Sequence, residues 1–113
     1  MKTKFYPIVL EKEFLFLKLV KERAGEVNFL FMSLWDPVCI NLAQEFMIDS
    51  VADDEDVSKK KPLYIIDSFN MPTVFPAMMV DKVPALVTIP KNKDASFFRK
   101  EEYVSNIYRR LGL

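Results

Sequence analysis

Cys39 is the only cysteine in the chain, and it lies in the segment Trp35-Asp36-Pro37-Val38-Cys39. A thiol near the start of a helix can act as a nucleophile in thiol–disulfide exchange, because the free N–H groups and the helix dipole favour the thiolate. Asp36 precedes Cys39 by three residues and is a residue type that caps helix N-termini. The segment therefore has two interpretations, a redox-active thiol or the ordinary beginning of a helix.

Residue types that the chain lacks exclude many enzyme classes. It contains no histidine, so Ser-His-Asp and Cys-His nucleophile systems cannot be built, and an ordinary zinc site is not expected. The two glycines, Gly25 and Gly112, are too few for a phosphate-binding loop or a dinucleotide fingerprint. We therefore predict no cofactor and no metal.

Length and charge limit the remaining classes. The 113 residues suffice for one domain with a core, and half of them are hydrophobic. Sixteen basic and sixteen acidic residues cancel, so neither a nucleic acid nor a membrane is expected as a partner. No leader-like or membrane-spanning apolar segment is evident, and a single cysteine suits a reducing compartment. We expect a cytoplasmic protein whose partners are proteins.

The first part of the chain has three segments with clear apolar patterns. We predict a strand over residues 4–10, with Pro7 indicating that it lies at a sheet edge or ends near that point. A helix over 11–25 and a strand buried on both faces over 27–34 follow. Gly25 is expected to end the helix. Its predicted buried residues are Phe14, Leu17 and Val20, with Leu15, Phe16 and Leu19 widening the stripe.

A second helix is predicted to begin at Asp36-Pro37, because aspartate is a good N-cap and proline suits the first helical position. Residues 49–62 carry an acidic run and then a basic one, which we interpret as a helix end and an exposed connection. A divalent-metal site is the alternative, but the ligand alternation around a glycine that calcium loops need is missing. The predicted buried stripe of the helix is Cys39, Leu42, Ala43, Phe46 and Met47.

The second half of the chain is predicted to hold three strands and two helical segments. A strand over 63–67 is followed by a partly helical segment over 68–82, by hairpin strands over 83–89 and 95–99, and by a closing helix within 100–113. The predicted buried side of the closing helix is Tyr103, Val104, Ile107, Tyr108 and Leu111.

The resulting order is β-α-β-α-β-α-β-β-α. Parallel crossovers followed by a hairpin require a mixed sheet with helices on both faces. The fold class is therefore an α/β three-layer sandwich, formed as a single domain over residues 1–113.

This order and two local motifs resemble the thioredoxin family over nearly the whole chain. Trp35 and Cys39 match the first and last positions of the family's Trp-Cys-Gly-Pro-Cys motif, which follows a buried strand and begins a helix. Pro84, within Val-Asp-Lys-Val-Pro-Ala-Leu-Val-Thr-Ile, matches the family's cis-proline. By this resemblance, Val83 would offer its backbone to an extended partner peptide.

The chain departs from the family pattern at two positions. Asp36 occupies the place of the attacking cysteine, and Leu30 occupies the place of a buried carboxylate that assists proton transfer. Dithiol exchange needs a second thiol to resolve the mixed disulfide, so the resemblance implies that this cycle cannot run within one chain. Trp-Asp-Pro-x-Cys is also similar to the small thioredoxin-like protein of the spliceosome, which acts by binding. Because those proteins lack the cis-proline at its usual place, the similarity serves as a precedent for a non-catalytic variant and does not assign the chain to splicing.

Cys39 itself has two readings. It shares an apolar stripe with Leu42 and Phe46, and burial raises the pKa of a thiol. Asp36 would act in the same direction, whereas a helix terminus contributes only about 0.3–1 kcal/mol towards the thiolate. Cys39 is thus a small core residue or a reactive single thiol, and Asp36 is a helix cap or an acid that blocks or modifies chemistry.

Two functions follow. The first is a protein-binding module that holds a protein partner or an extended peptide in the former substrate groove. The second is a single-cysteine redox protein in which Cys39 cycles through mixed disulfides. The missing cysteine and carboxylate favour binding, and the neutral, apolar composition also permits self-association. The predicted groove residues are Trp35, Asp36, Pro37, Val83 and Pro84.

Overall fold

The computed structural model describes residues 3–52, 59–91 and 96–113. Their strands and helices follow the predicted order. The strands are β1 (Phe5–Leu10), β2 (Val27–Met32), β3 (Lys61–Asp67), β4 (Ala85–Ile89) and β5 (Arg99–Glu101). The helices are α1 (Glu13–Glu22), α2 (Pro37–Ala52), α3 (Val74–Ala77) and α4 (Val104–Leu111).

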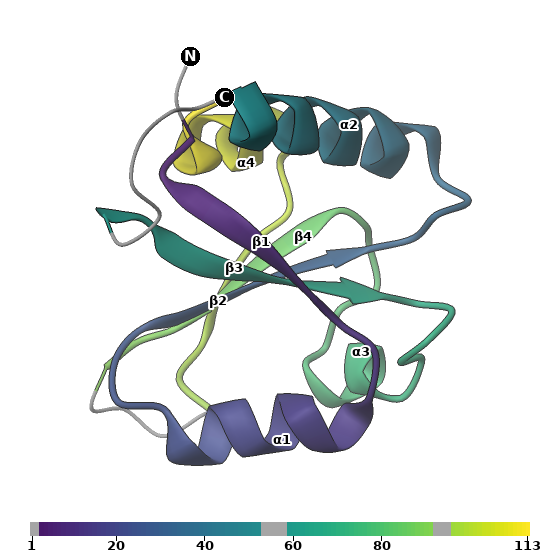
Figure 1. Ribbon diagram of the computed structural model, residues 1–113. Helices are drawn as coiled ribbons and strands as arrows, with labels where there is room; N and C mark the ends of the chain where they lie inside the picture. The colour runs from purple at the N-terminus through teal and green to yellow at the C-terminus, as the bar shows by residue number, and fades with distance from the viewer. Residues whose placement is uncertain (1–2, 53–58, 92–95) are drawn as a thin grey trace.

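The described strands form one mixed sheet in the order β1-β3-β2-β4-β5 (Figure 1). β1, β3 and β2 run parallel, whereas β4 is antiparallel to β2 and β5 is antiparallel to β4. Helices α1 and α3 cover one face of the sheet, and α2 and α4 cover the other (Figure 1). β1 is an edge strand that continues past Pro7 to Leu10, so the first of the two alternatives drawn from Pro7 is confirmed.

The central strand β2 contributes to both layers of the core. Phe29 and Phe31 pack in the cluster beneath α1 and α3, while Leu30 and Met32 pack in the cluster beneath α2 and α4. All four side chains are buried. A strand with helices on both faces needs a continuous apolar run rather than an alternating one, which is why β2 was recognisable in the sequence.

The predicted buried face of α1 is wrong in part, because only Phe16, Leu19 and Val20 of the predicted stripe pack on the core. Phe14 and Leu17 are exposed, and the buried residue is Phe16, with Leu19 and Val20 packed beside it. The ring of Phe16 lies 4.9 Å, centroid to centroid, from that of Phe29 on β2. Because α1 is apolar on more than one side, its orientation is decided by this contact and not by its own periodicity.

Gly25 does not end α1, which stops at Glu22. The guanidinium of Arg23 donates a hydrogen bond to the carbonyl of Val20 (2.6 Å) and so satisfies one of the last carbonyls of the helix. The described glycine with a left-handed conformation is Gly112, at the C-cap of α4.

The last strand was also misplaced. The prediction of 95–99 is wrong because the pairing of β5 with β4 begins at Arg99, opposite Thr88, and Phe97 is exposed. An edge strand tolerates charged residues, so Arg99–Glu101 gave no apolar signal. In α4, Ile107 and Leu111 are buried as predicted. Tyr103, at the N-cap position, and Val104, at the start of the helix, were also predicted to be buried but are exposed. Met47 on α2 is likewise exposed.

Candidate functional site

The segment from Ser33 to Asp36 joins β2 to α2 at the carboxyl edge of the parallel strands. Its backbone is closed by hydrogen bonds to Ser33, whose carbonyl accepts from the N–H of Asp36 (3.2 Å) and whose hydroxyl accepts from the N–H of Trp35 (3.3 Å). This tight turn fixes where Trp35 and Asp36 lie before the helix begins.

Asp36 caps helix α2, as predicted. Its Oδ2 accepts a hydrogen bond from the backbone N–H of Cys39 (2.9 Å), and its carbonyl accepts the first helical bond, from Ile40 (3.0 Å). Pro37 occupies the first helical position, where a missing N–H costs nothing. The cap therefore uses a donor that would otherwise be available to an anionic ligand or a thiolate.

Replacing Asp36 by alanine is expected to lower the free energy of unfolding by about 1 kcal/mol, because the N–H of Cys39 loses its acceptor. Urea denaturation of the wild-type and Asp36→Ala proteins measures this change. Asp81→Ala is the matched control, since Asp81 is an exposed aspartate outside the helices. Equal losses in both variants would contradict the assignment of Asp36 as a stabilising cap.

Cys39 is fully buried, with 0% of its surface exposed, and packs in the cluster that contains Leu42 and Phe46. Burial raises the pKa of its thiol to about 11, against an ordinary value of 9.0. The backbone of Ser33 donates to the sulfur and lowers the pKa, but the hydrogen bond and charge of Asp36 and the charge of Asp67 raise it. The difference corresponds to about 3 kcal/mol against ionisation, more than a helix terminus supplies.

The surface beside this thiol is apolar. Trp35 is 81% exposed, and Leu34, Val38 and Phe69 are also exposed. Phe69 follows Ser68, whose N–H donates to the carbonyl of Met32, so the segments that follow β2 and β3 lie together at this edge. We call Leu34, Trp35, Val38 and Phe69 the Trp35 surface. Leu34 and Phe69 were not predicted as site residues. Leu34 is the neighbour of Trp35 in the chain, whereas Phe69 comes near it only through the pairing of β3 with β2.

The Val83-Pro84 peptide bond is cis, as the sequence resemblance implied. The antiparallel pairing of β2 with β4 ends at Phe31 opposite Ala85, so Val83 and Pro84 continue beyond it towards the turn that follows β2. Pro84 is buried, and the half-buried Val83 packs against both core clusters. The pairing thus brings these two predicted groove residues to the same edge of the sheet as Trp35.

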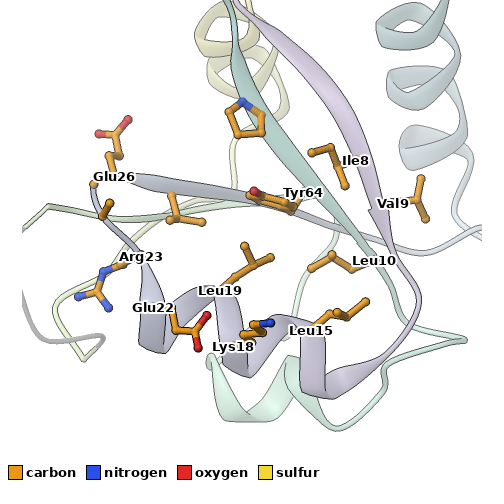
Figure 2. Close-up of a pocket in the computed structure, with 14 residues that line it drawn as sticks. Ile8, Val9, Leu10, Leu15, Lys18, Leu19, Glu22, Arg23, Glu26 and Tyr64 are labelled. Carbon is orange, nitrogen blue, oxygen red and sulfur yellow. The ribbon is translucent and has the colours of Figure 1, made fainter. Parts of the chain in front are cut away.

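A separate groove of about 600 Å³ lies on the α1 face of the sheet (Figure 2). Leu15 and Leu19 of α1 point towards Leu10 of β1 and Tyr64 of β3, with charged side chains of α1 at the rim. Since Cys39 belongs to the α2 face, this groove is distinct from the predicted site. It was not predicted, because it depends on how α1 crosses the edge strand.

Within the described residues, no cluster of histidine, cysteine, aspartate or glutamate could hold a metal ion. Part of the charged segment 49–62, the alternative metal site, lies outside the described residues. The helices of the described chain include none long and apolar enough to cross a membrane.

Comparison with solved structures identifies this architecture. Thioredoxin from Malassezia sympodialis superposes with a TM-score of 0.68 at 15% identity, over 99% of this chain and 93% of that one. Thioredoxin from Trypanosoma brucei brucei gives 0.65 at 12% identity, over 95% and 88%. The chain has the thioredoxin fold. Chloroplastic thioredoxin z, at 20% identity and a TM-score of 0.58 over 99% and 93%, agrees. No family model and no curated protein matches the sequence.

One further residue of this thioredoxin fold was missed in the sequence. Asp67 ends β3 and is only 6% exposed. Ile65 and Leu63, two and four positions earlier, pack on the α2 face. Side chains alternate along a strand, so Asp67 lies on that face as well. Leu30, which the sequence resemblance matched to a buried carboxylate, is an apolar member of the same layer. The signal for Asp67 was the alternation of side chains along β3, which predicts that its last residue points inwards like Leu63 and Ile65.

Proposed function

We propose that this thioredoxin-fold protein acts by binding an extended protein segment at the Trp35 surface, beside Val83 and Pro84, and does not run a dithiol cycle. The observation that carries the proposal is the contrast between two neighbouring side chains. Cys39 has no exposed surface and a raised pKa, whereas Trp35 is 81% exposed. A large exposed aromatic among other apolar groups is the usual anchor of a protein interface.

The composition of the site supports binding in a second way. Position 36 holds a carboxylate that caps α2 and raises the pKa of Cys39, so the charge there opposes a thiolate. The single cysteine provides no second thiol to resolve a mixed disulfide. A protein with one buried thiol fits a reducing compartment, and we propose the cytoplasm as its location.

The alternative is a single-thiol redox protein. The N–H of Ser33 donates to the sulfur and favours the thiolate, which is the one interaction in its support. Burial and the charges of Asp36 and Asp67 outweigh it, because the pKa of Cys39 still reaches about 11. We therefore place binding first.

The test is selection of peptides from a displayed library on the wild-type protein, followed by affinity measurements with variants. Trp35→Ala is expected to weaken a selected peptide by about 2 kcal/mol, or roughly thirtyfold, because an interface anchor is lost. Cys39→Ala is expected to leave the affinity unchanged. Phe14→Ala is the matched control, since Phe14 is an exposed aromatic of α1, the helix that covers the other face of the sheet from α2.

Two results would contradict the proposal. Peptides that bind Trp35→Ala as tightly as wild type would place binding elsewhere. Peptides that need Cys39, and that are held through a reducible bond, would favour the single-thiol alternative. Because Trp35 is mostly exposed, its replacement is not expected to unfold the protein.

A further inference from the structure

Strand β1 lies at the edge of the sheet, so half of its backbone groups face away from β3. The N–H of Lys61 donates to the carbonyl of Lys4 (3.2 Å), so Lys4 turns its backbone groups towards β3. The direction of these groups alternates along a strand. The residues of β1 whose backbone groups face outwards are therefore Phe5, Pro7 and Val9.

The beginning of this edge is closed to a further strand. The N–H of Phe5 donates to the hydroxyl of Thr3 (2.9 Å), and this hydroxyl donates to the carbonyl of Phe5. Pro7 has no N–H and offers its carbonyl alone. No described residue provides a partner for the outward N–H and carbonyl of Val9, whose side chain is exposed. The groups left for a partner in β1 are the carbonyl of Pro7 and the N–H and carbonyl of Val9.

Apolar hollows flank this part of the edge on both faces of the sheet. On the α1 face, Ile8 and Leu10 line the groove of about 600 Å³ (Figure 2). On the other face, Leu34 and Met47 line a hollow of about 190 Å³ between α2 and the sheet. Val9 lines both, and its side chain points away from Leu10 in Figure 2. The edge at Val9 therefore has apolar space on either side.

An extended segment lying along this edge would use both hollows at once. Successive side chains of a strand point to opposite faces of a sheet, so one would enter the groove and its two neighbours would reach the hollow beneath α2, or the reverse. Because both linings are largely apolar, the matching segment has apolar side chains at successive positions. In recognition by strand addition, main-chain hydrogen bonds provide affinity and pockets for alternate side chains provide specificity.

We propose that the edge of β1 binds an extended apolar segment of a partner protein as an added strand, through the backbone of Pro7 and Val9. The available groups are two acceptors and one donor, so the edge favours a segment that brings two N–H groups and contains no proline there. A second copy of β1 would bring the same excess of acceptors, which disfavours it as the occupant. The proposal does not depend on the function assigned to the Trp35 surface.

The probe is a blocked peptide, Lys-Val-Phe-Val-Lys, and its control is the same peptide N-methylated at the apolar residues, which removes the donors and keeps the side chains. Hydrogen exchange of the ¹⁵N-labelled protein reports the site. Saturating probe is expected to slow exchange of the Val9 amide at least about tenfold, because this amide gains an acceptor. The amide of Phe5, which already has one, should be unaffected.

Two substitutions change the donors of the edge without removing a hydrogen bond to β3. Val9→Pro removes the outward N–H and should weaken the probe about fivefold relative to Val9→Ala, which lacks the side chain but keeps the donor. Pro7→Val adds an outward N–H and should strengthen binding about fivefold. Trp35→Ala should bind the probe like wild type, which separates this site from the Trp35 surface.

The proposal would be overturned by equal protection of Val9 by the N-methylated peptide, by equal affinity of Val9→Pro and Val9→Ala, or by no saturable binding of the probe up to millimolar concentration. A Val9 amide protected without peptide, in a protein that sediments as a dimer, would also overturn it, because a second copy would then be the occupant. Impaired folding would weaken binding in both edge variants, so it cannot imitate shifts in opposite directions.

Discussion

Cys39 of the folded protein is expected to react with iodoacetamide at least about a hundredfold more slowly than in the unfolded chain at neutral pH. The thiolate is the reacting species, and a pKa raised from 9.0 to about 11 lowers its population by that factor. Complete burial adds a steric barrier. Intact mass at timed intervals, with and without denaturant, measures both rates.

The pH dependence of stability provides a control. Because the pKa of Cys39 is raised in the folded state, the unfolded chain ionises first as the pH increases from about 9 to about 11. Wild type should therefore lose stability across this range relative to Cys39→Ala, and the two should behave alike below it. Rapid labelling of the folded protein, with a pKa below 9, would contradict the buried state of the thiol.

Asp36→Cys is expected to form a disulfide with Cys39 under mild oxidation by diamide, where the wild-type chain forms no internal disulfide at all. The side chain of Asp36 already interacts with the thiol of Cys39, so a sulfur at this position would lie close to it. Intact mass should show the loss of two hydrogen atoms, reversed by dithiothreitol. The variant should also lose about 1 kcal/mol of stability when reduced, because the helix cap is removed.

Val38→Cys is the matched control for this experiment. It introduces a second thiol into the same helix, but adjacent side chains of a helix do not face each other. It should therefore remain reduced within the monomer under the same conditions. A failure of Asp36→Cys to form the bond, or equal bond formation in both variants, would show that position 36 is not the place of a lost partner thiol.

The fold was predictable because its signals are local. Strand β2 reads as a continuous apolar run, and α2 begins at an aspartate-proline pair, so each element could be identified from neighbouring residues. The face of α1 was not predictable, since Phe14, Leu17 and Phe16 are all apolar and only contact with Phe29 decides between them. Strand β5 was misplaced because its charged residues pair at a sheet edge, where apolar character is not required.

The features of the candidate site also divide into local ones, which the sequence predicted, and tertiary ones, which it did not. The capping role of Asp36 and the burial of Cys39 follow from spacing within one helix, and both were predicted. Asp67 ends β3 and Phe69 lies in the turn after it, so both come near residues 35–39 only through the pairing of β3 with β2. Tertiary contacts of this kind cannot be predicted from the residue pattern of a single segment. That no described residue donates a hydrogen bond to the carboxylate of Asp67 likewise depends on which side chains surround it.

The most direct test of the proposed function is incubation of the folded protein with oxidised glutathione at pH 8, followed by intact mass. If binding has replaced thiol chemistry, Cys39 should remain unmodified while the denatured chain gains one glutathione. Folded Asp36→Ala keeps the thiol buried, so it should form the mixed disulfide much more slowly than the denatured chain. A folded wild-type protein that forms the mixed disulfide as fast as the denatured chain would contradict the proposal and establish Cys39 as a working redox thiol.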